Sequence, residues 1–141
     1  MDKKLLGNLL IKRGEIFIGE KGTFDENISH SKFFVIMGED EDSYIGFFFI
    51  NSEVHKYIQT RPELYSLQYP LSPEKYSFLS HDSVIGCESI KRLKKQSVLD
   101  GLEQGSIVHK GTLLSSDIDV IINMVSKSKV FTKHEKDTYF K

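Results

Sequence analysis

The sequence predicts an α+β fold, mostly β: a small, partly open antiparallel β-barrel with a C-terminal amphipathic helix. Two observations lead to this prediction. The chain of 141 residues contains no Ala but has 14 Ile and 10 Phe, and this composition favours pleated strands over helices. Its apolar residues also fall into short runs bounded by Gly, Asn and Ser, and the longest stretch with helical spacing begins only near residue 116.

Three strands are expected in the first half of the chain. The first is the β-rich run from Gly14 to Gly19, which a polar loop follows. The second covers residues 32–37 and the third residues 44–50, so the short acidic segment 39–42 between them predicts an antiparallel hairpin. Both strands are apolar on both faces, and we therefore expect both faces to be covered.

The ends of this half are less regular. The leucine spacing over residues 2–12 indicates a short amphipathic helix, with a frayed terminus as the alternative. Residues 53–70 are expected to be irregular, because Pro62 and Pro70 interrupt them.

Further strands and helices are expected in the second half. The pattern predicts strands at residues 76–79, 84–87 and 107–111 and a short helix over residues 97–104. A longer helix follows. Ser116 and Asp119 fit an N-terminal capping box with Asp in place of Glu. Four apolar residues then recur with helical spacing: Ile118, Ile121, Ile122 and Val125. We expect residues 1–130 to form a single domain and residues 131–141 a loose polar tail.

Composition excludes several classes of protein. The formal net charge is −1, which argues against a strongly basic nucleic-acid coat but leaves room for a local basic groove. No apolar run approaches the roughly 20 residues of a membrane span, and the first residues do not fit a signal peptide. We therefore expect a cytoplasmic protein without membrane contact. The single cysteine, Cys87, is expected to be a small buried hydrophobe rather than a nucleophile.

No strong catalytic motif is present, and no two of the five histidines are spaced as a helical metal pair, so we expect neither a metal nor a cofactor. The acidic segment 39–42 is interpreted as a solvated turn rather than a cation site. Polar clusters do stand at strand ends: residues 30–32, 51–52 and 81–83. A small barrel presents its ligands at such places, but turns also require these residue types.

These clusters belong to five segments that follow one another between residues 13 and 126. They are Arg-Gly-Glu-Ile-Phe-Ile (13–18), Lys-Phe-Phe-Val-Ile-Met (32–37), Gly-Phe-Phe-Phe-Ile-Asn-Ser (46–52), Leu-Ser-His-Asp-Ser-Val-Ile (79–85) and Gly-Thr-Leu-Leu-Ser-Ser-Asp-Ile (111–118). Their order and spacing resemble the MazF/PemK-like toxin family (CcdB/Kid-type). That family has an Arg-Gly-acid-Ile start, an Arg-Pro-Val-Val-Val-Ile strand, a strand ending in Ile-Thr-Ser, a Leu-x-x-Asp-Ser-Val-Val segment and a Gly-x-Leu-Ser-x-x-Asp/Glu-Met helix start.

The resemblance implies an SH3-like barrel and a bacterial toxin–antitoxin protein. It implies a metal-independent endoribonuclease that acts on single-stranded RNA, forms a homodimer and is neutralised by a cognate antitoxin. Such an enzyme activates a ribose 2′-OH, stabilises a pentavalent phosphate and leaves a cyclic phosphate. This chemistry requires a base, a cationic phosphate clamp and hydroxyl or amide donors.

The chain departs from the family at the catalytic positions. The family Arg falls on Ser31, its Pro on Lys32 and its Thr on Asn51. Under the resemblance, His30 serves as acid/base, because imidazole changes charge near neutral pH. Lys32 supplies the phosphate clamp without the bidentate fork of Arg. Asn51 and Ser52 serve as donors. The remaining groove residues expected to bind RNA are His55, Arg61, His81 and Ser83.

Two other functions remain as alternatives. The first is a catalytically inactive SH3-like module that binds RNA or a protein partner, which the changed Arg and Thr positions and the near-neutral charge favour. The second is poisoning of a DNA topoisomerase in the manner of the CcdB relatives, which depends on fold analogy alone.

Overall fold

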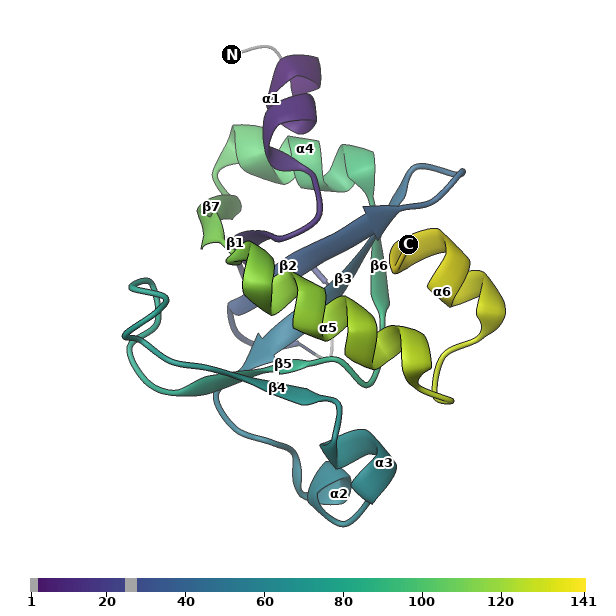
Figure 1. The fold of residues 1–141 in the computed structure, drawn as a ribbon. Coiled ribbons are helices and arrows are strands. Elements are labelled where there is room, and N and C mark those ends of the chain that lie inside the picture. The colour runs from purple at the N-terminus through teal and green to yellow at the C-terminus, as the bar shows by residue number, and fades with distance from the viewer. Residues whose placement is uncertain (1–2, 25–27) are drawn as a thin grey trace.

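The computed structural model describes residues 3–24 and 28–141 (Figure 1). It is an α+β fold, mostly an antiparallel sheet, as the sequence predicts. Its elements in chain order are α1 (Lys3–Leu10), β1 (Glu15–Gly19), β2 (Lys32–Glu39), β3 (Tyr44–Asn51), α2 (Lys56–Gln59), α3 (Pro62–Tyr65), β4 (Gln68–Leu71), β5 (Ser83–Gly86), β6 (Lys91–Lys94), α4 (Lys95–Gln104), β7 (Ile107–Thr112), α5 (Ser115–Lys127) and α6 (Lys133–Tyr139).

The sheet is an open one with strand order β4-β5-β3-β2-β1-β7. The predicted hairpin of β2 and β3 is confirmed, with Phe33 opposite Ile50 and Ile36 opposite Phe47. Strand β3 changes its second neighbour along its length. Its first half, as far as Phe47, pairs with β6, whereas its end, from Ile50, pairs with β5. The sheet therefore forks along β3.

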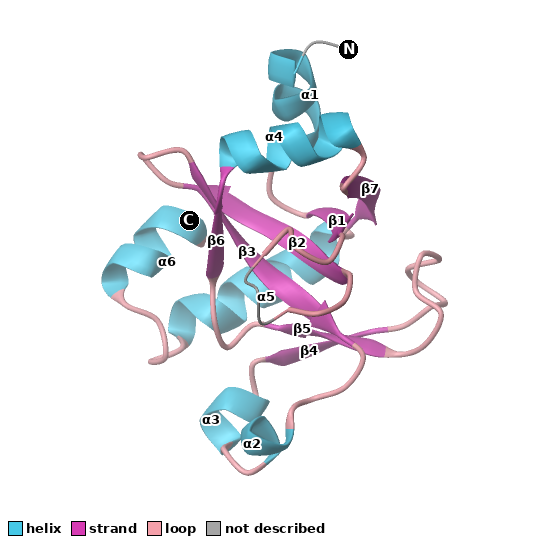
Figure 2. Cartoon of the chain, turned by 180° about the vertical axis from the view of Figure 1, so that it is seen from behind, coloured by secondary structure: helices cyan, strands magenta, loops and turns pink. Residues whose placement is uncertain are grey.

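Both faces of the central strands are covered, as their continuous apolar runs predict. Figure 2 shows α5 behind these strands and α4 across one end of the sheet. On one face, Val35 and Phe48 belong to a cluster with Val125 of α5. On the other face, Phe34 and Phe47 pack with residues of α4, β7 and the segment after α1. Alternate residues of each strand thus enter two different cores, which fixes the register of the hairpin.

The expectation of a loose polar tail is wrong. Residues 133–139 form α6, which begins with a complete capping box between Thr132 and Glu135. Three aromatic residues around this helix are buried in the core: Phe131, Tyr139 and Phe140. Arg13 fastens the same segment, because its guanidinium donates to the carbonyl of Met37 at 2.8 Å and to that of Tyr139 at 2.7 Å.

Three local predictions also fail. Helix α5 begins two residues earlier than a cap at Ser116 predicts, and its N-cap, Leu114, provides no side-chain cap, so the capping box of Ser116 and Asp119 does not form. The strand expected at 76–79 is a set of turns, and β4 lies instead in the segment expected to be irregular. Strand β4 contains Pro70, which an edge strand tolerates because its outer N–H groups pair with no neighbour.

No helix within the described ranges is both long and apolar enough to cross a membrane.

Candidate functional site

Three segments far apart in sequence meet at the end of the sheet where β2 begins. They are residues 30–33 before and within β2, residues 50–52 at the end of β3, and residues between 78 and 83 before β5. Antiparallel pairing brings them together, because β2 starts beside the end of β3, and Asn51 of β3 lies opposite Val84 of β5. They enclose a small pocket of about 220 Å³, called here the His30–His81 pocket.

Most of the candidate residues predicted from sequence line this pocket. They are His30, Lys32, Asn51, Ser52, His81 and Ser83. The other two, His55 and Arg61, are not among its lining residues. They are the exposed N-cap residues of the short helices α2 and α3, and the His55 ring stacks with that of Tyr57 at 5.9 Å. The structure therefore does not bring these two predicted RNA-binding residues to the site.

Lys32 is the cation of the pocket. Its Nζ donates a hydrogen bond to Oδ1 of Asn51 and lies 5.0 Å from the centroid of the Phe49 ring. Partial burial lowers the pKa of Lys32 from its usual value. An ammonium group has three N–H donors, so the bond to Asn51 leaves donors for a ligand. Burial, the ring and Asn51 together hold this cation in one place.

Asn51 is oriented from its other side by the backbone of β5. A Cβ atom added to Gly86 would lie 3.0 Å from Nδ2 of Asn51, closer than most Cβ contacts. Because Gly86 has no side chain, the Asn51 amide group can lie against strand β5. With Oδ1 accepting from Lys32, the Asn51 Nδ2 group is the part of this side chain that can donate.

The segment before β5 carries the second histidine. Nδ1 of His81 lies 3.0 Å from Oγ of Ser80, and Ser83 Oγ donates to the His81 carbonyl at 3.2 Å. The rings of Phe33 and Phe78, 5.1 Å apart, give the pocket an apolar side. Two imidazoles, an ammonium, an amide and hydroxyls are groups that move protons and bind a phosphodiester. Among the described residues, no three His, Cys, Asp or Glu side chains are arranged to hold a metal ion.

A larger pocket of about 530 Å³ adjoins the first and shares Ser52 and Ser83 with it. Its inner wall contains Asp117 of α5, which is only 4% exposed. Its carboxylate accepts hydrogen bonds from the hydroxyls of Tyr69 and Tyr76 and, at 3.3 Å, from Lys75. Burial alone would raise the pKa of Asp117, but these donors outweigh it and hold the pKa below its usual value.

The two tyrosines show the reciprocal effect. Burial and the hydrogen bond to Asp117 raise the pKa of Tyr69 and of Tyr76 to about 12. Tyr76 also accepts a hydrogen bond from the Leu114 backbone N–H, so the network fastens the start of α5 to β4 and the turn after it. Sequence reasoning missed this network. Its signal was that Asp117 shares a helix face with Ile121 and Val125.

Cys87 is fully buried, and burial raises the pKa of its thiol well above the usual value. The prediction of a small buried hydrophobe is confirmed.

No protein-family model and no curated protein sequence matches this chain. The function is therefore argued from the geometry of the pocket.

Proposed function

We propose that this chain is a divergent MazF/PemK-like protein that binds single-stranded RNA at the His30–His81 pocket and cleaves it without a metal ion. One observation carries the proposal: acid–base, cationic and amide or hydroxyl groups from three separate segments surround one pocket. The proposal also interprets the open sheet as a variant of an SH3-like barrel. It also includes a homodimer and a cognate antitoxin, which follow from the family resemblance alone, and the cytoplasmic location expected from the sequence pattern.

In the proposed reaction, His30 accepts the proton of a ribose 2′-OH, and O2′ attacks the adjacent phosphorus. The O2′–P bond forms while the P–O5′ bond breaks, and protonated His81 gives its proton to O5′. The products are a 2′,3′-cyclic phosphate and a 5′-hydroxyl. Lys32, the Asn51 amide and the Ser52 hydroxyl stabilise the charge on the phosphate oxygens during transfer.

A second candidate function is RNA binding without cleavage, and the position of the arginines favours it. Arg13 donates to backbone carbonyls, Arg92 pairs with Asp40 at 2.6 Å, and Arg61 begins α3. None of the three is among the residues that line the pocket. The pocket therefore relies on Lys32, which offers a point charge rather than a fork and already bonds Asn51.

The test is incubation of the purified protein with single-stranded RNA in the presence of a chelator, followed by analysis of the RNA ends. Cyclic phosphate ends are expected. Removal of His30 as a base is expected to slow cleavage by about 10²–10⁴-fold. The His30→Ala variant is compared with His134→Ala, which removes an exposed histidine of α6, and Lys32→Ala is compared with Lys133→Ala.

Each outcome separates the candidates. If both control variants cleave RNA and both pocket variants do not, the result supports the enzyme. If the RNA stays intact but the protein binds it, and Lys32→Ala weakens that binding, the result supports the binding module instead. Full cleavage by His30→Ala removes that residue from the mechanism. If the wild-type protein neither binds nor cleaves RNA, both candidates are wrong.

A further inference from the structure

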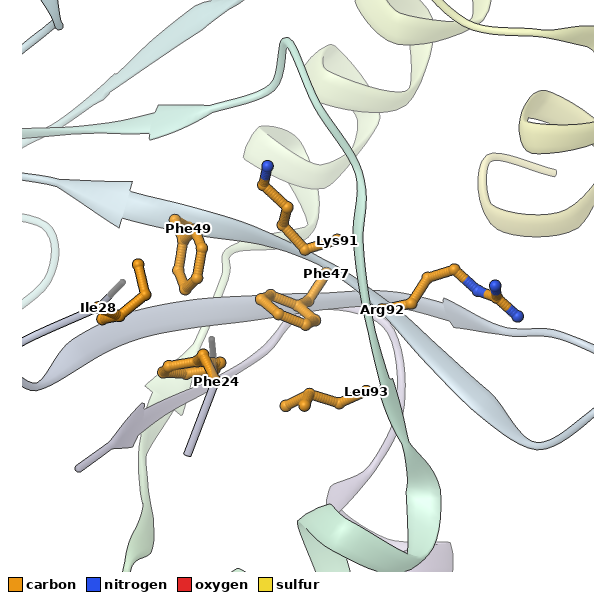
Figure 3. Close-up of a pocket in the computed structure, with 7 residues that line it drawn as sticks. All are labelled: Phe24, Ile28, Phe47, Phe49, Lys91, Arg92 and Leu93. Atoms are coloured by element: carbon orange, nitrogen blue, oxygen red, sulfur yellow. The ribbon is translucent and has the colours of Figure 1, made fainter. Parts of the chain in front are cut away.

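A third pocket, of about 460 Å³, opens at the fork of the sheet (Figure 3). Strand β3 pairs with β6 only as far as Phe47 and with β5 only from Ile50, so Phe49 lies in the gap between the two partner strands. Phe24 and Ile28, from the connection between β1 and β2, and Leu93 of β6 complete the apolar walls. We call this cavity the Phe24 pocket.

Its lining is aromatic, with cations only at the rim. The Phe24 ring meets the Phe49 ring edge-on at 5.0 Å and lies tilted against Phe47 at 5.7 Å. Figure 3 shows the Lys91 amine and the Arg92 guanidinium extending away from the rings, and Arg92 is paired with Asp40. A cavity of this size with ring walls and a charged rim suits a flat aromatic group attached to an anion.

A contact between Lys32, which lines the His30–His81 pocket, and Phe49, which lines the Phe24 pocket, links the two pockets. Phe49 forms a wall of the Phe24 pocket, and Nζ of Lys32 lies 5.0 Å from the centroid of its ring. The cation assigned to the RNA phosphate therefore lies against a ring of the neighbouring aromatic cavity. In single-stranded RNA a base and a phosphate alternate in the same way, and proteins bind such strands with aromatic platforms beside cationic grooves.

We propose that the Phe24 pocket binds an unstacked nucleobase of the RNA strand whose phosphate lies at Lys32. The inference depends on the proposed function, in its cleaving or its non-cleaving form. It adds a site that recognises the base, separate from the groups that handle the phosphate. An apolar side chain of a protein partner is the competing occupant, and equal binding of the two probes described next would remove the base from the pocket in its favour.

The test measures binding of two fluorescently labelled probes that cannot be cleaved. One is a 2′-O-methyl RNA hexamer of randomised sequence, and the other is the same sugar–phosphate backbone without bases. The wild-type protein is expected to bind the hexamer about tenfold or more tightly than the base-free backbone. Phe24→Leu keeps an apolar side chain but removes the ring, and it is expected to abolish most of that difference. Tyr65→Leu, which changes an exposed ring, is the matched control.

A second variant guards against misfolding. Ile28→Trp fills the Phe24 pocket without removing any of its rings, and it is expected to lower hexamer affinity while leaving binding of the base-free backbone unchanged. If both pocket variants bind the hexamer as the wild type does, while Lys32→Ala weakens it, the inference is wrong and the proposed function stands. Equal wild-type affinity for the two probes also overturns the inference. If the wild type binds neither probe, the inference and the proposed function fail together.

Discussion

Replacing Asp117 with Asn is expected to destabilise the protein strongly, although the two side chains have almost the same shape. Tyr69 and Tyr76 both donate to the carboxylate, and hydrogen bonds to a charged group contribute about 1.5–3 kcal/mol each. The Asn amide keeps one acceptor oxygen, so one bond is lost and the other becomes a neutral one. Asp117 also lies in the first turn of α5, where a negative charge contributes roughly 0.3–1 kcal/mol.

The sum is an expected loss of about 3–5 kcal/mol in the free energy of unfolding. Lys75 adds little to it, because its side chain is 52% exposed and solvent screens the pair. Urea denaturation at neutral pH measures the loss. The matched control is Asp119→Asn, the same chemical change on an exposed residue of the same helix. Equal unfolding free energies for the two variants would refute the reasoning.

The difference between the wild type and Asp117→Asn is also expected to depend on pH. The pKa of Asp117 is lower in the folded protein than in the unfolded chain, so the unfolded chain binds more protons as the pH falls. The contribution of the carboxylate is therefore fully present above the unfolded pKa of about 4 and decreases as the pH falls toward the folded pKa. The two unfolding free energies should converge in acid. A gap that stays constant down to pH ~2 would contradict this linkage.

Two further predictions concern the C-terminal segment. Phe140→Ala is expected to cost about 3–5 kcal/mol in unfolding free energy, because the ring is buried against Phe48. The control Tyr65→Ala, at an exposed ring, should cost less than about 0.5 kcal/mol. Similar losses for the two variants in urea denaturation would mean that residues 131–141 are not part of the core. Gly46→Ala places a Cβ atom 2.5 Å from the Tyr139 ring. It is expected to lower the free energy of unfolding by about 1–3 kcal/mol and to change the near-ultraviolet circular dichroism of the tyrosines. An unchanged spectrum and an unchanged stability would show that α6 does not pack there.

The parts of the fold that sequence could predict are those with local signals. The hairpin follows from two long apolar runs separated by a short acidic turn, and the convergence of residues 30–32 with residues 51–52 follows from antiparallel pairing. The only local signal for the burial of Asp117 was the helix face that it shares with Ile121 and Val125. Nothing local identified its tyrosine partners, which lie 48 and 41 residues away. The Phe24 pocket arises from a change of strand partner along β3, which no single strand pattern encodes.

The sequence pattern did not predict helix α6, for a related reason. Its buried residues stand at its two ends, Phe131 before the helix and Tyr139 and Phe140 at its close, so no apolar spacing of three and four appears within it. The acidic turn is exposed at Glu39, Glu41 and Asp42, as predicted, but Asp40 is anchored. Burial alone would raise the pKa of Asp40, and donors from Tyr44, Arg92 and Tyr139 lower it to about 2. The burial of α6 and the anchoring of Asp40 both depend on contacts made across the fold.

The arginines connect these findings to function. Arg13 stands in the motif that resembles the start of the toxin family, yet its guanidinium is occupied by carbonyls of β2 and of the C-terminal segment. That part of the resemblance is therefore explained by the fold rather than by catalysis. In the proposed function, the charge that binds a phosphate comes from Lys32, which burial, Phe49 and Asn51 hold in one place. A fixed point charge beside an aromatic pocket positions a strand well, but it stabilises a pentavalent phosphate less specifically than a bidentate fork. Within the proposed function, these groups are therefore better suited to holding an RNA strand than to fast cleavage, and the hexamer measurement tests the proposed binding separately from the proposed cleavage.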